Sequence, residues 1–270
     1  MTYRECISLL KAGGIKAPQH EAQVLFSHFG GFSPAKLLSD DPSLDSEEIK
    51  IAVNKRLHGT PLQYITGKAF FRNEIYAVNE NCLIPRNDTE LLVEETVNRL
   101  PAGAVFLDLC TGSGCVAISV LASRKDTRAV AAEISAGALE LASENADKNG
   151  VAKRISFIKT DVLNDAAIAG PFDAIVSNPP YIATAELCSL PDDVLAEPRI
   201  ALDGGEDGIT FYRAIIKKYN SNLRADGFFA FEIGYDQAKR LRAVFNEAGL
   251  SAEVIQDLGG NDRVMILRKA

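Results

Sequence analysis

Tryptophan is absent from this 270-residue sequence, and histidine and cysteine are scarce. The three histidines and five cysteines are scattered, and no two cysteines form a Cys-x-x-Cys pair. The cysteines are Cys6, Cys82, Cys110, Cys115 and Cys188. Zinc sites and disulfide frameworks both depend on characteristic cysteine or histidine spacings, so this pattern argues against either and favours a reducing, cytoplasmic compartment. We therefore expect no metal site.

Long hydrophobic runs are also missing. A helix needs roughly 20 consecutive apolar residues to cross a bilayer, and no segment of the sequence approaches that length. The first residues, Met1–Glu5, lack the pattern of a signal peptide. These absences predict a cytoplasmic protein with no membrane attachment.

Positive charge is in deficit, because 29 Lys and Arg residues stand against 36 Asp and Glu residues and the net charge is −7. Tight, sequence-independent binding to nucleic acid comes from contacts of Lys and Arg with phosphates. Stable nucleic-acid binding is therefore not expected. The hydrophobic content of 47% and the charged content of 24% are instead typical of an ordinary globular protein.

The first 60 residues show four short amphipathic patterns separated by short loops, which predicts a small helical bundle. Thr2 with Glu5, and Asp45 with Glu48, have the spacing of helix-capping pairs. The bundle serves either as a packing cap for the rest of the chain or as a docking surface for a macromolecular substrate. Residues 61–85 contain two short apolar segments that predict a hairpin linker to a larger domain at residues 86–270.

Strands and helices alternate in the larger domain after a first helix that ends near Leu100. Strands are expected at 105–109, 128–132, 155–158, 172–176, 228–233, 252–256 and 264–267, and helices at 114–122, 135–146, 209–223 and 235–248. This alternation predicts an α/β fold with a doubly wound, mostly parallel sheet. The last two strands have no helix between them and are too close for a parallel crossover, so the last strand should run antiparallel.

A glycine loop follows the first of these strands. The segment Asp108, Leu109, Cys110, Thr111, Gly112, Ser113 and Gly114 runs from the end of that strand through this loop. Its small residues let the backbone approach a ligand closely. Gly112–Ala117 also fits the dinucleotide pattern G-x-G-x-x-A, and Glu133 ends the next strand, where an acid binds ribose hydroxyls. Both features serve a dinucleotide or S-adenosylmethionine (SAM), so the loop alone leaves the cofactor open.

The motif Asn178-Pro179-Pro180-Tyr181 follows the buried strand at 172–176. Two prolines fix the backbone and remove two N–H donors, and Pro179 keeps Asn178 out of the helical region. We expect a stiff turn that presents the Asn178 carboxamide and the Pro179 carbonyl to one point, where both can accept a hydrogen bond from an –NH2 group. The Tyr181 ring suits a planar partner at the same point. The motif therefore indicates a planar substrate with an amino nitrogen.

Two features favour SAM over a dinucleotide. Asp108 precedes the loop and can meet the methionine ammonium group, whereas a dinucleotide needs the helix N-terminus free for its pyrophosphate. The motif at Asn178 suits an amino nitrogen and has no obvious part in hydride transfer. Asp161, at the end of the third strand, is either an acceptor for the adenine amino group or a solvated acid.

Together these residues resemble the HemK/PrmC family, the protein-(glutamine-N5) methyltransferases of class I peptide-chain release factors. The resemblance extends across most of the chain through Pro61–Gly67, Leu83–Arg86, Thr89-Glu90, the Asp108 loop, Asn178–Ile182, Glu197–Leu202, Gly204–Gly208 and Asp257–Arg263. It implies a helical N-terminal domain, a hairpin linker and a Rossmann-like SAM-dependent methyltransferase domain. The roles of Arg86 and Glu90 are left open between bracing the cofactor pocket and capping a helix.

The resemblance also implies the reaction: transfer of a methyl group from SAM to the side-chain amide nitrogen of the glutamine in the GGQ motif of class I peptide-chain release factors. Asn178 and the Pro179 carbonyl would hold the glutamine –NH2, Tyr181 would pack on the amide plane, and Pro180 would complete the substrate-binding turn. The cofactor-binding residues would be Asp108, Cys110, Thr111, Gly112, Ser113, Gly114, Glu133, Asp161, Val162 and Asn178.

Three positions depart from the family's pattern. Many members have glycine where this chain has Cys110, and a cysteine is tolerated there if its φ is negative. Many have Asp at the position of Glu133, whose longer side chain can still accept hydrogen bonds from two ribose hydroxyls. The position of Val162 is often aromatic, so stacking on adenine should be weaker at this point.

Three other functions compete with this interpretation. An adenine-N6 methyltransferase acting on DNA or RNA offers the same –NH2 group to the same motif, but needs a basic channel that the acidic composition does not favour. An NAD-dependent oxidoreductase is supported only by G-x-G-x-x-A. A binding module without turnover would retain the pocket, although the intact motif from Asn178 to Tyr181 argues against it.

Overall fold

The computed structural model describes residues 1–269, and the chain divides into two compact units. The smaller unit contains Met1–Lys68 and Pro191–Ala196, and the larger unit contains Ala69–Leu190 and the chain from Glu197 onward. The predicted hairpin linker is thus shared: residues 61–68 fold with the helices, and the rest of it folds with the larger unit. No helix of the described residues is long and apolar enough to cross a membrane.

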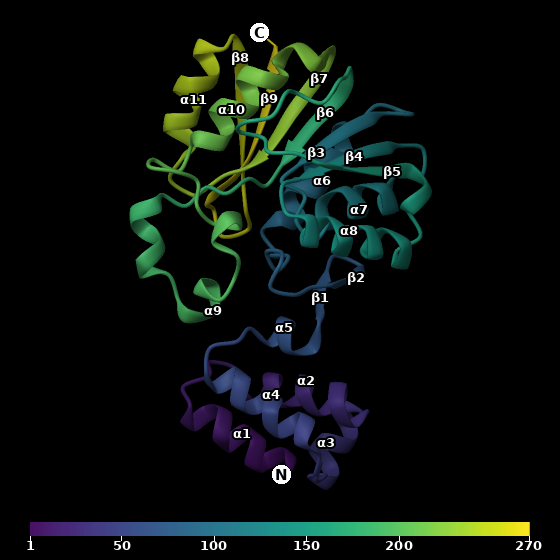
Figure 1. Cartoon of the computed structure of the whole chain (residues 1–270), viewed down its shortest axis with the longest axis vertical. Helices are drawn as coiled ribbons and strands as arrows, with labels where there is room; N and C mark the ends of the chain where they lie inside the picture. Colours follow the sequence, from purple (N-terminus) through teal and green to yellow (C-terminus); the bar gives the residue numbers. More distant parts are fainter. Residues whose placement is uncertain (270) are drawn as a thin grey trace. The chain divides into compact units, whose positions relative to one another are not determined.

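The smaller unit is helical (Figure 1). Its helices are α1 (Tyr3–Ala12), α2 (Pro18–Gly30), α3 (Pro34–Asp40), α4 (Glu47–Leu57), α5 (Leu62–Thr66) and α9 (Asp192–Leu195). The predicted capping box at Thr2 and Glu5 is present, whereas α4 is capped by the Ser46 hydroxyl rather than by Asp45. Leu10, Leu25 and Phe26 are fully buried in a single core, which explains the apolar spacing of these helices.

The larger unit holds a hairpin and a seven-stranded sheet. The hairpin strands are β1 (Lys68–Phe71) and β2 (Glu74–Ala77). The sheet strands are β3 (Val105–Leu109), β4 (Arg128–Glu133), β5 (Ile155–Lys159), β6 (Phe172–Ser177), β7 (Leu223–Glu232), β8 (Leu250–Gln256) and β9 (Asp262–Lys269). The helices are α6 (Thr89–Arg99), α7 (Cys115–Ser123), α8 (Ala136–Lys148), α10 (Thr210–Tyr219) and α11 (Ala238–Glu247). Short 3-10 turns are η1 (Ala152–Arg154), η2 (Thr184–Ser189), η3 (Arg199–Ala201) and η4 (Asn220–Asn222).

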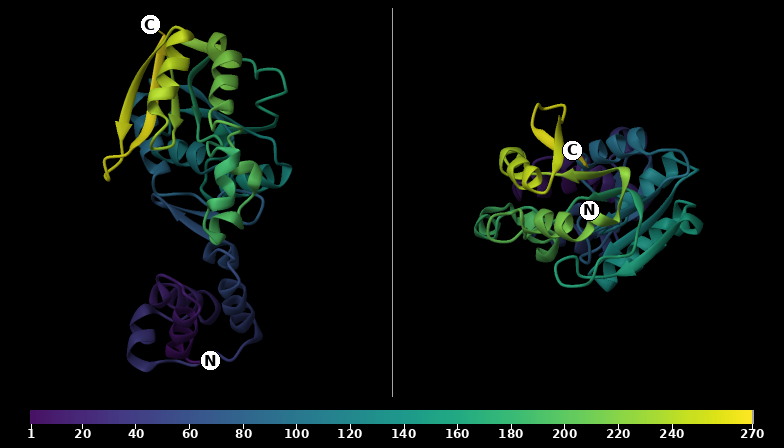
Figure 2. Two further views of the ribbon diagram at one scale, coloured as in Figure 1. Left: turned by 90° about the vertical axis from the view of Figure 1, so that its left-hand side faces the viewer. Right: turned by 90° about the horizontal axis from the view of Figure 1, so that it is seen from above.

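The strand order is β5-β4-β3-β6-β7-β9-β8. The five neighbouring strands from β5 to β7 in this order are all parallel, and β9 runs antiparallel to both β7 and β8. The predicted doubly wound sheet with an antiparallel last strand is therefore confirmed. Figure 2 shows the β8–β9 hairpin, in yellow, at one edge of the sheet. The chain moves outward from β3 through β4 to β5 and then returns to place β6 beside β3. This reversal is a topological switch point, where open α/β sheets bind ligands.

The sheet is buried on both faces. One core joins α10 and α11 to alternate strand residues such as Leu107, Phe229 and Met265. Residues between these, such as Phe106 and Phe228, are equally buried although they point to the other face. α6 and α7 pack against each other, and α6 also contacts β7. Burial of both faces explains why the strands read as continuous apolar runs rather than as alternating ones.

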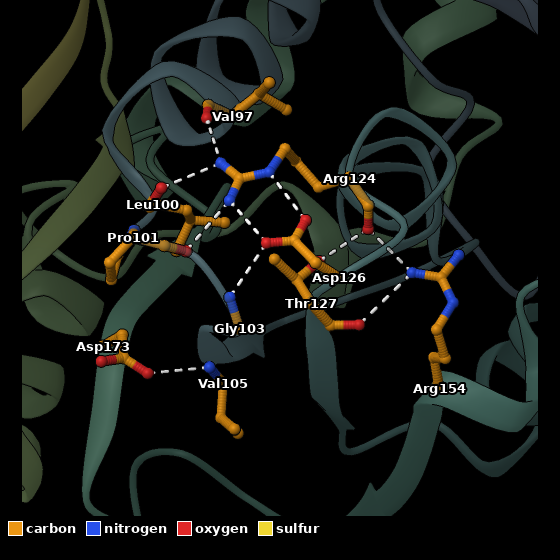
Figure 3. A network of polar contacts seen from close by, with 10 residues as sticks. All are labelled: Val97, Leu100, Pro101, Gly103, Val105, Arg124, Asp126, Thr127, Arg154 and Asp173. Carbon is orange, nitrogen blue, oxygen red and sulfur yellow. Dashed lines mark hydrogen bonds and ion pairs between the residues drawn. The ribbon is translucent and has the colours of Figure 1, made fainter.

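A polar network holds the edge of the sheet where β3 and β4 begin (Figure 3). The Arg124 guanidinium donates to the carbonyls of Val97, Leu100 and Pro101 at 3.1, 2.8 and 3.0 Å, and it pairs with Asp126. These carbonyls lie at and just beyond the C-terminal end of α6, where backbone acceptors lack helical partners. The hydrogen bonds of Arg124 hold the pKa of the Asp126 carboxyl well below its usual range. The network therefore braces the edge opposite to the carboxyl ends of β3 and β4.

Arg124→Lys should destabilise the larger unit without changing its ligand affinity. A lysine ammonium cannot reproduce the planar fork that reaches three carbonyls, so the free energy of unfolding should fall by about 1–3 kcal/mol. Denaturant unfolding measures this change. Arg128→Lys, at an exposed position at the start of β4, is the matched control and should unfold like the parent. Equal stability of both variants would contradict the bracing role of the network.

Candidate functional site

A cavity of about 260 Å³ opens in the larger unit at the carboxyl ends of the central strands. Its walls come from the loops after β3, β4, β5 and β6, together with the segment before α6 and the start of α10. Among the residues predicted from sequence, it is lined by Asp108, Cys110, Thr111, Gly112, Ser113, Glu133, Asp161, Val162, Asn178 and Pro180. Gly114, Pro179 and Tyr181 are not among its lining residues. The cavity therefore gathers the acidic strand ends and Asn178 at one place.

Asp108 is almost fully buried at the base of this cavity. Its carboxylate accepts a hydrogen bond of 2.5 Å from the Thr111 hydroxyl. Burial raises the pKa of Asp108 to about 7, because removal from water penalises the charged form more than the Thr111 hydroxyl stabilises it. Glu133 raises the pKa further through like charge. A cation placed beside Asp108 would relieve both effects.

Cys110 has a φ of +58°, in the left-handed region. The expectation that cysteine would be tolerated here through a negative φ is therefore wrong. A non-glycine residue in this region carries strain of roughly 1–2 kcal/mol, because Cβ crowds the neighbouring carbonyl oxygen. A glycine at this position would avoid that strain, because it has no Cβ.

Gly114 explains why the loop needs small residues. Its φ is +82°, and a Cβ at this position would lie 2.8 Å from Ile118 Cδ1 and 3.2 Å from Ala142 Cβ. Any side chain would therefore be strained by the positive φ and would press against Ala142 of α8. Although Gly114 does not line the cavity, it sets the close packing of α7 that places Gly112 and Ser113 at the cavity wall.

Glu133 holds the glycine loop from the end of β4. Its carboxylate accepts hydrogen bonds from the backbone N–H groups of Gly112, Ile134 and Ser135 at 3.0, 2.9 and 3.1 Å. A carboxylate offers about four lone-pair positions, so one remains for a further donor. The structure thus shows Glu133 bracing the loop, and binding two hydroxyl groups would require it to release at least one backbone partner.

Asp161 forms a local turn at the cavity rim. It accepts from the Leu163 N–H at 2.7 Å and from the Asn164 side chain at 2.7 Å. The Asn164 contact is the main reason that the pKa of Asp161 is lowered. Val162 is buried beside it, and Phe211 from α10 lines the same cavity. An aromatic ring is therefore present in the cavity, although it comes from a distant helix rather than from the position after Asp161.

Asn178 presents its carbonyl oxygen without a partner. Its Nδ2 lies 3.2 Å from Thr89 Oγ1, at the start of α6, whereas Oδ1 is buried and has no hydrogen-bond partner among the described residues. A buried acceptor without a donor is costly and uncommon, and such atoms mark places where a ligand supplies the missing hydrogen bond. Asn178 therefore offers an acceptor in a cavity that also contains a buried acid.

Tyr181 is held by glycine residues that follow it in the chain. A Cβ on Gly204 would lie 2.7 Å from Tyr181 Cα, and one on Gly208 would lie 2.5 Å from the Tyr181 carbonyl oxygen. That carbonyl accepts a hydrogen bond of 2.8 Å from Gln237. The Gly204–Gly208 segment thus packs directly on the Asn178–Tyr181 turn. Burial raises the pKa of the Tyr181 hydroxyl, so the group stays protonated near neutral pH.

Sequence reasoning missed two polar clamps on the site. The buried Glu197 carboxylate accepts from the Ile84 N–H at 2.8 Å and pairs with Arg86, which lines the cavity. The fully buried Asn145 side chain on α8 donates to the Ala77 carbonyl at 3.0 Å and to the Ser113 carbonyl at 2.9 Å. Both contacts join residues far apart in sequence, so no local pattern signalled them. Glu90 does not line the cavity and accepts from the Arg72 N–H at 3.0 Å.

Comparisons with known proteins agree with this architecture. A model described as "Methyltransferase small domain" matches residues 87–227, and one described as "PrmC N-terminal domain" matches residues 2–67. The release factor glutamine methyltransferase of Chlorobaculum tepidum is 38% identical over 264 residues, covering 92% of this chain and 90% of the relative. The same-named protein of Moorella thermoacetica is 38% identical and covers 97% of this chain and 95% of the relative. The chain belongs to the release factor glutamine methyltransferase family.

Solved structures confirm the predicted methyltransferase fold. The catalytic domain of hMettl16, solved in complex with the MAT2A 3'UTR hairpin 6, has a TM-score of 0.58 at 15% identity and covers 84% of each chain. A ribosomal protein L11 methylase from Lactobacillus delbrueckii subsp. bulgaricus has a TM-score of 0.51 at 24% identity and covers 68% of this chain and 81% of that chain. The resemblance inferred from sequence is confirmed, and with it the conclusion that the chain is a SAM-dependent methyltransferase.

The residues in the cavity fit this cofactor. The buried Asp108 carboxylate can meet a positively charged group, and the small residues Gly112 and Ser113 line the cavity beside it. The buried Asn178 Oδ1 lacks a donor among the described residues. SAM carries an ammonium group, hydroxyl groups and a sulfonium, so an acidic, partly apolar cavity of this kind matches its chemistry.

Proposed function

We propose that this chain methylates the side-chain amide nitrogen of the glutamine in the GGQ motif of class I peptide-chain release factors. The names of its relatives, release factor glutamine methyltransferase, support this substrate. The observation that carries the proposal is the buried Asn178 Oδ1, which has no donor among the described residues and lies in the same cavity as Asp108. An amide –NH2 supplies the donor that this oxygen lacks.

The difficulty of the reaction is the weak nucleophile. The lone pair of an amide nitrogen is delocalised into its carbonyl group. Asn178 Oδ1 and the Pro179 carbonyl would accept hydrogen bonds from the glutamine –NH2, which increases electron density on the nitrogen and fixes its direction. Tyr181 would pack on the amide plane, with Pro180 keeping the turn rigid. When bound, SAM supplies an electrophilic methyl group on a sulfonium, and the protein supplies position and electrostatics.

The cofactor side of the cavity is assigned to the acids and the glycine loop. Asp108 would hold the methionine ammonium group, and the loop from Cys110 to Gly114 would follow the methionine backbone. Glu133 would accept from the ribose after releasing a backbone partner. Asp161 and Val162 would contact the adenine, with Phe211 adding an aromatic surface to the same cavity.

The helices at residues 1–60 are proposed to dock the release factor, and the reaction is proposed to take place in the cytoplasm. The second candidate, adenine-N6 methylation of DNA or RNA, rests on the same –NH2 chemistry at Asn178. The net charge of −7 weighs against it, because nucleic-acid binding depends on cationic contacts.

A transfer assay distinguishes the substrate classes. The protein is incubated with methyl-labelled SAM and, separately, with a class I release factor, DNA and tRNA. We expect label only on the release factor, at the glutamine of its GGQ motif. A release factor with that glutamine replaced is the matched control and should stay unlabelled. Label on nucleic acid, or equal labelling of the control, would refute the proposal.

Asn178→Ala should remove most of the turnover while SAM affinity falls far less. The variant loses the acceptor for the glutamine nitrogen, and losing one oriented polar group in an active site lowers kcat by roughly 10²–10³-fold. Single-turnover kinetics and cofactor titration measure the two quantities separately. Near-normal turnover would remove Asn178 from the mechanism.

SAM affinity should depend on pH through Asp108. The pKa of Asp108 is about 7 in the free protein, so below pH 7 the carboxyl is mostly neutral and cofactor binding must displace a proton. We expect the affinity to fall by about tenfold between pH 7.5 and pH 6, because each pH unit below the pKa costs up to tenfold. Asp108→Asn should bind more weakly and lack this slope. Calorimetric titration at both pH values tests this, and the same slope in both proteins would exclude Asp108 as its source.

A further inference from the structure

Gln237 is a buried residue that joins three separate backbone segments beside the Asn178–Tyr181 turn. It directly precedes α11 and is only 4% exposed. Its Nε2 donates to the carbonyls of Tyr181 and Gly208 at 2.8 and 3.1 Å. Its Oε1 accepts from the Gly234 N–H at 3.0 Å. A primary amide has two N–H donors and one carbonyl oxygen, so every polar group of this side chain has a partner.

These three partners fix the orientation of the Gln237 amide. The two carbonyls can only accept and the Gly234 N–H can only donate, so an amide turned by 180° would lose all three hydrogen bonds. The side chain also has little room to move. A Cβ on Gly208 would lie 2.9 Å from Gln237 Nε2, and a Cβ on Gly234 would lie 3.1 Å from Gln237 Cδ. Gln237 is therefore held in one position between the two glycines.

The peptide group between Tyr181 and Ile182 is held on both of its sides. Its carbonyl oxygen accepts from Gln237, and its N–H, which belongs to Ile182, donates to the Leu202 carbonyl at 3.1 Å. Because a peptide group is planar, hydrogen bonds at both ends fix its plane. The two prolines restrict φ earlier in the turn. The contact with Gln237 therefore fixes the point at which the chain leaves the turn.

Gln237 acts on the turn from the side away from the cofactor cavity. Asn178 and Pro180 line that cavity, whereas neither Gln237 nor Tyr181 does. Gln237 and Tyr181 instead line a second cavity of about 530 Å³ in the larger unit. A change at Gln237 should therefore alter the turn without altering the cofactor-binding residues.

We propose that Gln237 is a positioning residue that fixes the peptide group between Tyr181 and Ile182 and thereby keeps the Asn178–Tyr181 turn in the geometry that holds the substrate amide. The inference rests on the proposed function in one respect, namely that this turn holds the substrate –NH2. The clamp on the turn is a property of the protein without substrate, so it can be tested even if the substrate assignment fails.

The first test measures kcat on a class I release factor at saturating SAM. Gln237→Met keeps the length of the side chain but removes both N–H donors. We expect kcat to fall by about 10- to 100-fold, because a displaced group in an active site costs this much, while SAM affinity stays that of the parent. Arg124→Lys, which removes hydrogen bonds from the opposite edge of the sheet, is the control for lost stability and should keep the parent kcat while folded.

The second test uses Gln237→Glu, which separates a lost donor from a lost side chain. An ionised carboxylate can accept from Gly234 but cannot donate to either carbonyl, whereas a protonated carboxyl regains one donor. Burial raises the pKa of such a carboxyl. The acids lining the second cavity raise it further, since they outnumber its one cation; its titratable residues are Tyr181, Glu186, Glu206, Asp207, Tyr235, Asp236 and Arg240.

The kcat of Gln237→Glu, divided by that of the parent at the same pH, should therefore rise as the pH falls from about 8.5 to about 6. The same ratio for Gln237→Met should stay low and flat. A flat ratio for Gln237→Glu would contradict a role for the donated hydrogen bonds, and this measurement decides the question even if Gln237→Met fails to fold.

The third test needs no substrate. Hydrogen exchange of the Ile182 amide reports on the clamped peptide group, because this N–H and the Tyr181 carbonyl belong to the same plane. In Gln237→Met it should exchange about tenfold faster than in the parent, while the amides of β3 keep their rates. Unchanged exchange at Ile182 overturns the inference.

The outcomes separate this inference from the proposed function. Faster exchange at Ile182 in a protein that never labels a release factor supports the clamp and refutes the proposed substrate. Labelling of the release factor by the parent, together with a parent-like kcat in Gln237→Met, refutes the positioning role and leaves the proposed function standing.

Discussion

The parallel pairing of β6 with β3 is the constraint on which the site depends. The Ser177 hydroxyl at the end of β6 donates to the Leu109 carbonyl at the end of β3, at 2.6 Å and fully buried. Because the two strands end in register, the loops that follow them begin at the same edge of the sheet. The Asp108 loop and the Asn178 turn, 70 residues apart, thereby share one cavity. A shift of one residue would turn every inward side chain of β6 to the other face.

At the edge of the sheet that carries the cavity, close packing depends on glycines, which have no side chain. Gly114 lets α7 pack against α8, while Gly204 and Gly208 lie against the backbone of Tyr181 where any Cβ would collide. The opposite edge is held differently, by Arg124 on helix-end carbonyls (Figure 3). Close backbone approach thus shapes the edge that carries the cavity, and charge-assisted hydrogen bonds secure the opposite edge.

Much of the fold and of the cavity lining could be predicted from the sequence, because the end of a strand is marked by the residues next to it. The placing of Asp108, Glu133 and Asn178 at the carboxyl ends of strands follows from where apolar runs stop. The antiparallel β9 follows from the lack of a helix between the last two strands. Other features depend on long-range contacts that no local pattern encodes. Glu197 clamps a segment more than a hundred residues earlier, and Phe211 reaches the cavity from α10. The left-handed φ of Cys110 was mispredicted, because a tight turn selects backbone geometry that residue identity alone does not reveal.

Asp108 on β3 and Glu232 on β7 are both buried acids with a raised pKa, but only Asp108 lines the cavity. Burial raises the pKa of both Asp108 and Glu232 to about 7. Asp108 lines the cavity, so a cationic ligand can compensate its charge. Glu232 is not among the residues that line the cavity, and Thr89, Arg263 and Tyr181 oppose the rise of its pKa. The larger unit therefore holds one buried carboxylate that lines the cavity and one that does not.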